Sequence, residues 1–361
     1  MRNFHVVEPN KSLRRRLHSD ARAKRVTLKM LADHLGLSPA TISLVMNRAS
    51  VADSIPRATQ ERIFAAAREL NYRPSFAARW ARTARSFTIG VMVPEVSEGY
   101  ASLVLSGIEA HLLREGYFYL VASHRHLDDL IDEYPRLFLA RSVDGIIAVD
   151  TPWRSDLEIP VATVSGHDRS NGVTNIVLDH DRAAELALGH LQRLGHKRIA
   201  FIKGQEFSSD TAARWESIKK VAARLGIDVS PKLTVQLEGD LASPELGYRL
   251  TKSLLERKVP FTALFAFNDV SAIGAIEALR SSQLEVPDDV SVIGFDDIQN
   301  AAFQRPQLTT VKQPLKKMGT IAAEALLKRI ARPDDDSYPR EFVIEPELIV
   351  RKSTAAAGQR D

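Results

Sequence analysis

Apolar residues near the N-terminus recur three or four positions apart, which is the spacing of one face of an α-helix. In the segment VTLKMLADHLGLSPATISLVMN (26–47), this spacing predicts a first helix that begins after Thr27 and ends at Gly36. Ser38 followed by Pro39 predicts the start of a second helix, because proline fits the first helical position. Two short helices joined by a glycine-containing turn are typical of a helix-turn-helix, although an ordinary helical hairpin has the same periodicity.

The second predicted helix has one apolar face and one face of mostly small or polar residues. Ile42 and Val45 point to the predicted core. The opposite face carries Ala40, Thr41, Ser43, Leu44 and Asn47. Small side chains let a helix approach another backbone closely, and Ser and Thr can donate hydrogen bonds to phosphates. This face therefore favours nucleic-acid binding, with a plain solvated face as the alternative.

Two more helices are predicted before residue 87. One spans 57–70 and has an apolar face. The other begins after Pro74, where Ser75 can cap it, and it carries Arg79 and Arg82 but few apolar residues. Short isolated helices are marginal in water. We therefore expect this segment to fold only against DNA or a partner chain.

From Thr88 onward the pattern changes to buried strands that alternate with helices. The predicted strands span 87–96, 118–123, 143–150, 159–165, 196–204, 233–240, 262–269 and 290–297. The predicted helices span 101–116, 134–141, 181–194, 209–225, 247–256, 270–282 and 317–331. Such alternation indicates an α/β fold of parallel sheets with helices on both faces. Because about 270 residues are many for one such sheet, we expect two doubly wound lobes.

The composition is that of a globular protein. Of the 361 residues, 44% are hydrophobic and 26% are charged, which excludes a fibrous or largely disordered chain. The chain has no Cys, which excludes disulfides, iron–sulfur clusters and thiolate zinc sites. No apolar run reaches the length of a membrane helix, and the N-terminus has no signal-peptide pattern. We therefore expect a cytoplasmic protein with no membrane contact.

Charge divides the chain into two parts. Residues 1–86 hold 17 Lys and Arg against 6 Asp and Glu, a net charge of +11. Residues 87–361 hold 32 against 39, a net charge of −7, and the two parts add to the +4 of the whole chain. A basic segment joined to an acidic body predicts a head that binds a polyanion such as DNA, although residues 1–25 could serve only solubility.

The segments VTLKMLADHLGLSPATISLVMN, ELNYRP and AAR, at this spacing, resemble the DNA-binding head and hinge of the LacI/GalR family of bacterial transcription regulators. The resemblance implies that the second helix enters the major groove of a double-stranded DNA operator. It also implies that the segment after Pro74 forms a minor-groove hinge helix paired with that of a second subunit. We therefore expect a homodimer, with a tetramer as the alternative. The implied DNA-contacting residues are Thr27, Ser38, Pro39, Ala40, Thr41, Ser43, Leu44, Asn47, Ala78, Arg79 and Ala81.

Three features depart from the family pattern. The loop RASVADSIPRA (48–58) is longer than usual. Leu44 stands where the family often has a base-reading arginine, and Ala81 where it usually has a leucine that separates base pairs. Leucine can pack on a thymine methyl group but cannot pair with guanine, and alanine is too short for a wedge. We therefore expect a preference for thymine and a less bent operator, unless Trp80 replaces the wedge.

The body continues the resemblance in AARW, FNDVSAIGA, VSVIGFDD and LTTVKQP, which are similar to the core of the same regulators. That core is similar to periplasmic sugar-binding proteins, which implies two lobes linked by crossover strands, with a small effector between them. The predicted domains are a disordered basic tail at 1–25, a helix-turn-helix domain at 26–72, a hinge helix and linker at 73–87, a two-lobed core at 88–353 and a C-terminal tail at 354–361.

Polar residues stand at the ends of three predicted strands, at Asp240, at Asn268 with Asp269, and at Asp296 with Asp297. Ligands of open α/β sheets bind outside the carboxyl ends of the strands, so we expect these side chains to meet in the cleft. Asp269 is interpreted as a helix N-cap, and Asp297 as a structural carboxylate in a turn or cap.

Arg214 lies near the start of a predicted helix, where the helix dipole disfavours a cation, so a binding role explains it better than stability does. The resemblance implies an effector site made of Arg214, Asn268, Asp296, Asp179 and Gln313. Arginine donates two parallel hydrogen bonds, and Asp and Asn oxygens accept from hydroxyls, which suits a sugar or similar polyol. Phe267 and Phe295 are interpreted as core residues, Trp215 as either core or stacking, and Leu241 as the loss of an aromatic contact to the sugar.

An enzyme and a transport-type sugar-binding protein are the alternatives. No GxGxxG motif follows the first strand, and the chain has no P-loop and no GxSxG motif. His124 and His126 have no third ligand at metal spacing and are interpreted as a solvated loop. We therefore expect no catalytic activity, cofactor or metal. The basic head favours a DNA-binding regulator, and repression is the commoner outcome in the family.

Overall fold

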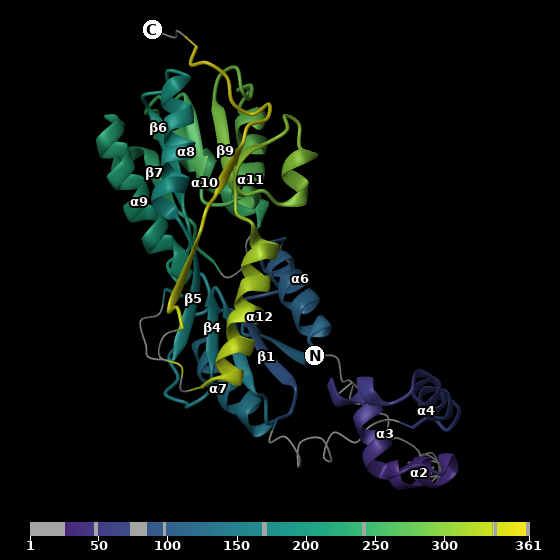
Figure 1. Ribbon diagram of the computed structural model, residues 1–361. Helices are drawn as coiled ribbons and strands as arrows, with labels where there is room; N and C mark the ends of the chain where they lie inside the picture. The colour runs from purple at the N-terminus through teal and green to yellow at the C-terminus, as the bar shows by residue number, and fades with distance from the viewer. Residues whose placement is uncertain are drawn as a thin grey trace, which may run out of the picture. The chain divides into compact units, whose positions relative to one another are not determined.

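The computed structural model describes residues 26–46, 50–72, 85–96, 99–167, 172–239, 243–333, 335 and 338–358. The chain divides into two compact units at the boundary between Ser86 and Phe87. Figure 1 shows the chain coloured from the N-terminus to the C-terminus and labels many of its helices and strands. The predicted basic tail and most of the predicted hinge lie outside the described residues.

The described part of the first unit is a small helical head. Its elements are α2 (Leu28–Leu35), α3 (Pro39–Met46), the 3-10 helix η2 (Ser50–Ser54) and α4 (Arg57–Glu69). As predicted, Thr27 caps α2 by accepting a hydrogen bond from the Met30 amide, and Gly36 ends the helix in the left-handed conformation. The centre of the head core is formed by one fully buried residue from each α-helix, Leu31, Ile42 and Ile63.

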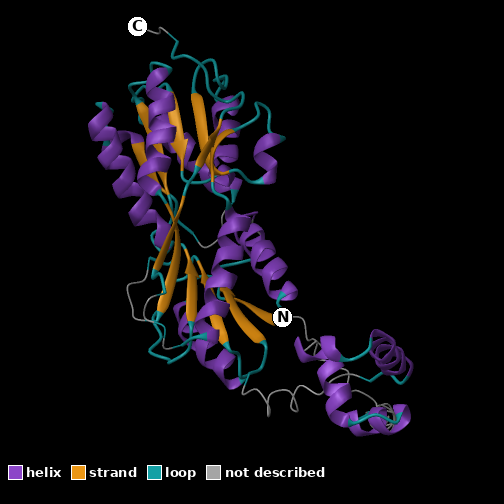
Figure 2. Cartoon of the chain, viewed as in Figure 1, coloured by secondary structure: helices purple, strands orange, loops and turns teal. Residues whose placement is uncertain are grey.

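The second unit contains two α/β lobes, of which the first has a six-stranded parallel sheet in the order β11-β5-β4-β3-β1-β2. Its elements are β1 (Thr88–Val93), α6 (Gly99–Arg114), β2 (Phe118–Ser123), α7 (Asp128–Ala140), β3 (Gly145–Val149), β4 (Val161–Val164), β5 (Val173–Leu178), α12 (Leu315–Ala331) and β11 (Glu341–Ile344). Helices α6 and α12 pack on one face of the sheet and α7 on the other. Figure 2 shows the strands of both lobes flanked by helices.

The second lobe has a sheet in the order β12-β10-β9-β8-β6-β7, which is parallel except for the β10–β12 pair. Its elements are α8 (His180–Arg193), β6 (Ile199–Lys203), α9 (Ser209–Leu225), η3 (Pro231–Leu233), β7 (Thr234–Gln236), α10 (Pro244–Glu256), β8 (Ala263–Ala266), α11 (Asp269–Ser281), β9 (Ser291–Asp296), η4 (Gln299–Ala302), β10 (Thr309–Lys312) and β12 (Glu347–Ile349). Helices α8 and α9 cover one face, and α10 and α11 cover the other.

The two lobes are joined by crossovers of the chain. Within the described residues, the chain passes between the sheets after β5, after β10 and after β11. The predicted fold class, a helical head with two doubly wound lobes linked by crossovers, is confirmed. After β12 the chain continues along the second lobe, where the Ala357 amide donates to the Leu194 carbonyl oxygen at 2.7 Å.

Some predicted boundaries differ from the structure. The helix predicted at 134–141 begins at Asp128, because Asp128 and Asp129 suit the first turn and Pro135 is accommodated inside the helix. The strand predicted at 233–240 is shortened to β7. Four strands were not predicted, namely β5, β10, β11 and β12, which are three to six residues long and adjoin the crossovers.

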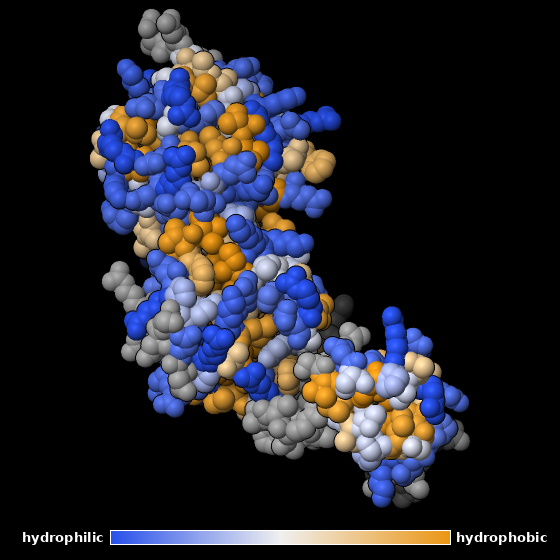
Figure 3. All heavy atoms as spheres, viewed as in Figure 1, coloured by the Kyte–Doolittle hydropathy of each residue, from blue (hydrophilic) through white to orange (hydrophobic). Residues whose placement is uncertain are grey.

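The surface of the second unit mixes polar and apolar side chains, as the view in Figure 3 shows for one face. The large exposed apolar side chains include Leu113 on α6 and Phe118 and Val121 on the edge strand β2. An exposed apolar sheet edge is a common site of contact between protein chains. Among the described helices, none is both long and apolar enough to cross a membrane.

Helices α6 and α12 touch at their backbones. A Cβ atom on Gly107 of α6 would lie 1.9 Å from the carbonyl oxygen of Lys316 in α12. Gly107→Ala must therefore push the two helices apart. We expect the free energy of unfolding to fall by at least about 1–3 kcal/mol, the usual cost of overpacking a core, and equilibrium denaturation measures this change.

Gly189→Ala in α8 is the matched control. Its Cβ atom would come no closer than 3.4 Å, to the end of the flexible Arg193 side chain. Because alanine favours the helix, this variant is expected to keep wild-type stability or gain up to about 1 kcal/mol. A Gly107→Ala protein as stable as wild type would contradict the close contact.

Candidate functional site

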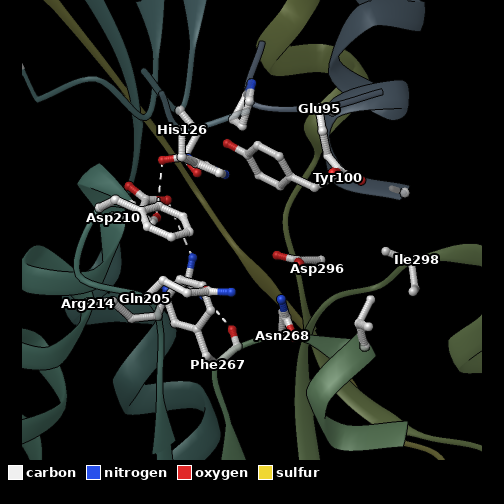
Figure 4. A pocket seen from close by; sticks show the side chains of 17 residues that line it. Glu95, Tyr100, His126, Gln205, Asp210, Arg214, Phe267, Asn268, Asp296 and Ile298 are labelled. Atoms are coloured by element: carbon white, nitrogen blue, oxygen red, sulfur yellow. Dashed lines mark hydrogen bonds and ion pairs between the residues drawn. The ribbon is translucent and has the colours of Figure 1, made fainter. Parts of the chain in front are cut away.

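A cavity of about 90 Å³ lies between the two lobes, at the carboxyl ends of their strands. Its polar and aromatic lining includes Glu95, Tyr100, His126 and Asp150 from the first lobe, and Gln205, Phe207, Asp210, Arg214, Phe267, Asn268 and Asp296 from the second. Figure 4 shows side chains of both lobes around this space. The position is the one expected for a ligand of parallel α/β sheets.

Arg214 is the cation of this cavity. It extends from α9 and is 5% exposed, and its guanidinium carbon lies 4.3 Å from the ring centroid of Phe267 and 3.7 Å from that of Phe295. One terminal nitrogen donates to the Phe267 carbonyl oxygen at 2.6 Å, and the other lies 3.4 Å from Oδ2 of Asp210. Its buried Nε has no hydrogen-bond partner among the described residues. The group is therefore rigidly held and has donor capacity left for a ligand.

Asp296 ends β9 and presents a carboxyl group to the same cavity. Its φ of 108° is rare for a residue with a side chain and indicates local strain. Gln313 donates from Nε2 to Oδ1 of Asp296 at 2.6 Å. Burial raises the pKa of Asp296 to about 7, although the charge of Arg214 acts in the opposite direction. Near neutral pH this carboxyl group can therefore either accept or donate.

Hydrogen bonds join the two lobes at the N-terminus of α9. Asp150, which follows β3 in the first lobe, accepts from Ser208 Oγ at 3.1 Å and from the amide and hydroxyl of Ser209 at 3.2 and 2.9 Å. The Ser209 hydroxyl also contacts the Ser165 carbonyl oxygen. Burial and the neighbouring Asp210 raise the pKa of Asp150 to about 7, against the effect of the serine donors. The serines of α9 thus anchor the second lobe to the first.

Asp210 makes a second contact between the lobes. Its Oδ1 lies 2.7 Å from Nε2 of His167, which follows β4, and 3.2 Å from Nε2 of His180 at the start of α8. Burial opposes the ionisation of Asp210, but His180, His167 and Arg214 outweigh it and hold the pKa of this carboxyl well below its usual range. The hydrogen bond to Asp210 in turn raises the pKa of His167.

The interpretation of His124 and His126 as a solvated loop is wrong. His124 is fully buried, and its Nε2 lies 2.8 Å from Oγ1 of Thr151, whose hydroxyl donates to the Val149 carbonyl oxygen. Because Thr151 must accept, Nε2 of His124 carries the proton, and its Nδ1 accepts from the His126 amide at 3.1 Å. His126 lines the cavity and stacks on Phe207 of the second lobe, with ring centroids 3.7 Å apart.

The N-cap of α11 is Asn268. The interpretation of Asp269 as a helix N-cap is therefore wrong. Asn268 has extended backbone geometry and accepts from the Ser271 amide at 2.8 Å. Asp269 is the first helical residue, and it accepts from Thr310 Oγ1 at 2.6 Å and from the Ile298 amide at 2.9 Å. The Asn268 oxygen is therefore engaged in the cap, while its amide nitrogen remains available at the cavity.

Of the five predicted effector residues, Arg214, Asn268 and Asp296 line the cavity. Asp179 lies outside it and caps α8 by accepting from the Arg182 amide at 2.8 Å. Gln313 also lies outside the lining, and its hydrogen bond to Asp296 orients that carboxyl group. Asp297 pairs with Arg351 at 2.6 Å, which agrees with a structural role.

The aromatic candidates divide between core and cavity. Phe295 is buried in the core as predicted, whereas Phe267 lines the cavity, and both pack on Arg214. Trp215 packs edge-on against Phe201 at 5.7 Å in the second-lobe core. Asp240 and Leu241 lie outside the described residues.

The head presents several predicted DNA-contacting residues at the start of α3. Ser38 Oγ accepts from the Thr41 amide at 3.0 Å, and Pro39 and Ala40 are exposed in the first turn. Leu44 is half-buried and packs on the head core. The longer loop before α4 forms η2, which contributes Ala52 to that core. Five of the candidates for DNA contact lie outside the described residues: Asn47, Ala78, Arg79, Trp80 and Ala81.

Comparison with known proteins finds one family match within each of the two units. The family described as bacterial regulatory proteins, lacI family, matches residues 27–75, and a periplasmic binding protein-like domain matches residues 188–354. The HTH-type transcriptional repressor PurR of Haemophilus influenzae is 32% identical over 338 residues, which cover 91% of this chain and 98% of that protein. The chain belongs to the LacI family of bacterial regulatory proteins.

Solved structures of LacI family proteins have the same fold. The lac repressor dimer bound to operator and the anti-inducer ONPF has a TM-score of 0.78 and 28% identity, over 92% of this chain and 100% of that chain. A LacI family transcriptional regulator from Enterococcus faecium with bound ribose has a TM-score of 0.65 and 29% identity, over 74% of this chain and 99% of that chain. The resemblance seen in the sequence is therefore confirmed.

Sequence reasoning missed several residues that line the cavity of this LacI family protein. Asp150 ends a predicted strand, so the signal that identified Asp296 was also available there. His126 was considered only as a possible metal ligand with His124, and Phe207 stands in a loop with no local pattern that marks it. Their proximity depends on how the two lobes are placed, which periodicity along the chain does not contain.

The buried, neutral His124 predicts acid sensitivity of the core. Burial lowers its pKa from the ordinary 6.5 to about 4, so between these pH values the unfolded chain takes up a proton that the folded protein does not. Above pH 6.5 the ring is neutral in both states, and the free energy of unfolding is not reduced by this group. Between pH 6.5 and pH 4 the free energy of unfolding falls by up to about 3 kcal/mol, at 1.36 kcal/mol per pKa unit.

Denaturation curves of wild type and His124→Gln between pH 7 and pH 4 test this prediction. The amide of glutamine can still donate to Thr151 but does not titrate, so the variant should lose less stability on acidification. The other titrating groups are shared, so the difference between the two proteins isolates His124. Parallel stability profiles would contradict the assignment.

Proposed function

We propose that this protein is a sequence-specific, DNA-binding transcriptional repressor that responds to a small-molecule effector held between the lobes. The observation that carries the proposal is the union, in one chain, of a helix-turn-helix head and a two-lobed core with a polar cavity at the strand ends. The repressor from Haemophilus influenzae, similar over 91% of this chain, supports repression as the outcome.

Helix α3 is proposed to read the operator in the major groove. Its first turn is exposed, and the hydroxyl groups of Ser38 and Thr41 at this turn can donate to phosphate oxygens. Leu44 is proposed to contact a thymine methyl group with the part of its side chain that the head core does not cover. The remaining proposed DNA-contacting residues are Thr27, Ser38, Pro39, Ala40, Thr41, Ser43, Asn47, Ala78, Arg79 and Ala81.

The proposed effector is a sugar or a similar neutral polyol. Each hydroxyl group can both donate and accept, which matches a cavity that offers the donors of Arg214 and Asn268 beside the carboxyl groups of Asp150 and Asp296. The stacked rings of His126 and Phe207 add an apolar wall. The similar Enterococcus faecium regulator holds ribose, which supports this class of ligand.

We further propose a homodimer in which the effector sets the geometry of the two heads. The exposed apolar side chains of Leu113, Phe118 and Val121 offer a contact surface along α6 and β2, and the similar lac repressor is a dimer. A ligand that contacts both lobes would change the angle between them, and with it the order of the paired hinge segments.

A steep dependence on salt is expected for binding to DNA. Each phosphate contact releases counterions, so a head with net charge +11 over residues 1–86 should lose at least about a hundredfold in affinity between 50 and 200 mM salt. Fluorescence anisotropy with a selected operator measures the slope. Deleting residues 1–25 should flatten the slope without changing operator preference. If the truncated protein no longer discriminated between operators, residues 1–25 would take part in sequence recognition, which contradicts a purely electrostatic, non-specific role for this segment.

Arg214→Lys separates effector binding from DNA binding. Lysine keeps a positive charge near Asp210 but loses the two-pronged donor, so ribose, or another neutral sugar found in a thermal-shift screen, should bind at least about tenfold more weakly. Operator affinity without the sugar should not change, because the head is a separate compact unit. Calorimetric titration measures the sugar affinity of each protein.

Arg224→Lys, an exposed position on the same helix, is the matched control and should bind the sugar as wild type does. Equal sugar affinity in Arg214→Lys and wild type would contradict the assignment of this cavity as the effector site. Failure of every neutral sugar in the screen would instead leave the DNA-binding proposal standing and remove the polyol proposal.

A further inference from the structure

Three side chains with metal-ligand chemistry meet beside the cavity. In the part of the chain that the structure describes, His167, His180 and Asp210 each bring one nitrogen or oxygen atom within 4.8 Å of the others. His167 follows β4 of the first lobe, whereas His180 begins α8 and Asp210 lies in the first turn of α9 in the second lobe. Because the three residues come from three elements, no short motif in the sequence reveals them.

The spacing of these atoms is close to that around a small divalent ion. Nε2 of His167 and Nε2 of His180 lie 2.7 and 3.2 Å from the same oxygen, Oδ1 of Asp210. Ligand atoms that bind tetrahedral Zn²⁺ at about 2.0–2.2 Å lie about 3.3 Å from one another. A small outward movement of the partly exposed His167 ring would complete this geometry.

The buried ring of His180 is poorly explained by hydrogen bonding alone. Its Nδ1 has no partner among the described residues, and an unpaired buried polar atom costs about 1–3 kcal/mol. Its Nε2 makes a contact of 3.2 Å, which is longer than the roughly 2.7–2.9 Å of a strong charge-assisted bond. A metal ion at Nε2 would leave Nδ1 unpaired as before, so its contribution is to replace the weak 3.2 Å contact with a coordinate bond that holds the buried ring more strongly.

The surroundings supply further carboxyl groups and an outer contact. Asp150 and Asp296 line the same cavity as Asp210, against the single guanidinium group of Arg214. Arg214 lies 3.4 Å from Oδ2 of Asp210, the oxygen that the two imidazoles do not contact. Contacts of this kind orient a carboxylate that binds metal through its other oxygen. The chain has no Cys, so a nitrogen and oxygen site does not compete with thiolates.

We propose that His167, His180 and Asp210 bind a divalent transition-metal ion, with Zn²⁺ as the best match to two imidazoles and one carboxylate. His167 is the one ligand from the first lobe, so an ion held by all three residues fastens the lobes to each other. A fourth coordination position remains for water or a ligand group. The site adjoins the effector cavity through Asp210, but its test does not depend on the proposed sugar.

Metal titration of the full-length protein tests the site directly. Zn²⁺ is added to chelator-treated wild type, His167→Gln and His180→Gln in a non-coordinating buffer, and binding is followed by calorimetry. Wild type should take up one equivalent more than either variant, or bind that equivalent more than about tenfold more tightly. His190→Gln, which alters a histidine that pairs with Thr354, should behave as wild type.

Two further readouts distinguish coordination from a structural role of the histidines. Co²⁺ in place of Zn²⁺ should give visible absorption bands of a four-coordinate site in wild type and His190→Gln, but not in the two ligand variants. Zn²⁺ in excess should raise the melting temperature of wild type by several degrees and leave that of His167→Gln unchanged. If His180→Gln does not fold by circular dichroism, the partly exposed His167→Gln decides the result alone.

The same number of Zn²⁺ equivalents with the same affinity in wild type and both variants would place the metal elsewhere, for example on other histidines, and would overturn the proposal. Absence of any binding tighter than about 10 μM would overturn it as well. In either case the two imidazoles act only as hydrogen-bond donors to Asp210.

Discussion

The burial of one guanidinium group organises the space between the lobes. A buried cation is tolerated only if nearby groups compensate it. Arg214 finds that compensation in two aromatic faces, the Phe267 carbonyl oxygen and the Asp210 carboxylate. Because Arg214 and Asp210 are one turn apart on α9, the requirement fixes the start of this helix at the cleft. The adjoining Ser208 and Ser209 then meet Asp150 of the first lobe. Compensation of a single charge thus also sets the contact between the lobes.

Most of the fold could be predicted from local patterns. Buried parallel strands are nearly continuous apolar runs, as in GIIAV of β3, and they stand out between amphipathic helices. The head was predictable because capping residues act locally, as Thr27 does at α2. The strands that adjoin the crossovers were not, because they are short and contain polar or charged residues, as EFVI of β11 and ELI of β12 do. Their strand conformation comes from pairing with neighbours far away in sequence.

The candidate site was predictable only where chemistry coincides with the end of a strand or with a family motif. Arg214, Asn268 and Asp296 meet that condition and do line the cavity. His124 does not, because its burial follows from a tight turn after β2, in which Arg125 and His126 both have positive φ. His126 and Phe207 become neighbours only when the two lobes are brought together, so their stacking is a property of tertiary structure alone.

The lobes are held together by hydrogen bonds as well as by the stacking of His126 on Phe207, and the hydrogen bonds matter for regulation. Each hydrogen bond at Asp150 or Asp210 contributes only about 0.5–1.5 kcal/mol, or somewhat more where charge assists, because water replaces the partner when the bond opens. A few such bonds hold the lobes by an amount comparable with the ~8 kcal/mol that a micromolar ligand supplies on binding. A ligand that contacts both lobes in only one arrangement can therefore shift the equilibrium between arrangements. A difference of about 5.5 kcal/mol in its binding to the two arrangements changes their ratio from about 1:99 to about 99:1. An apolar interface of similar area would lose far more on opening, since water does not compensate exposed hydrocarbon. The polar character of the cleft thus keeps the relative position of the lobes within the control of a small molecule.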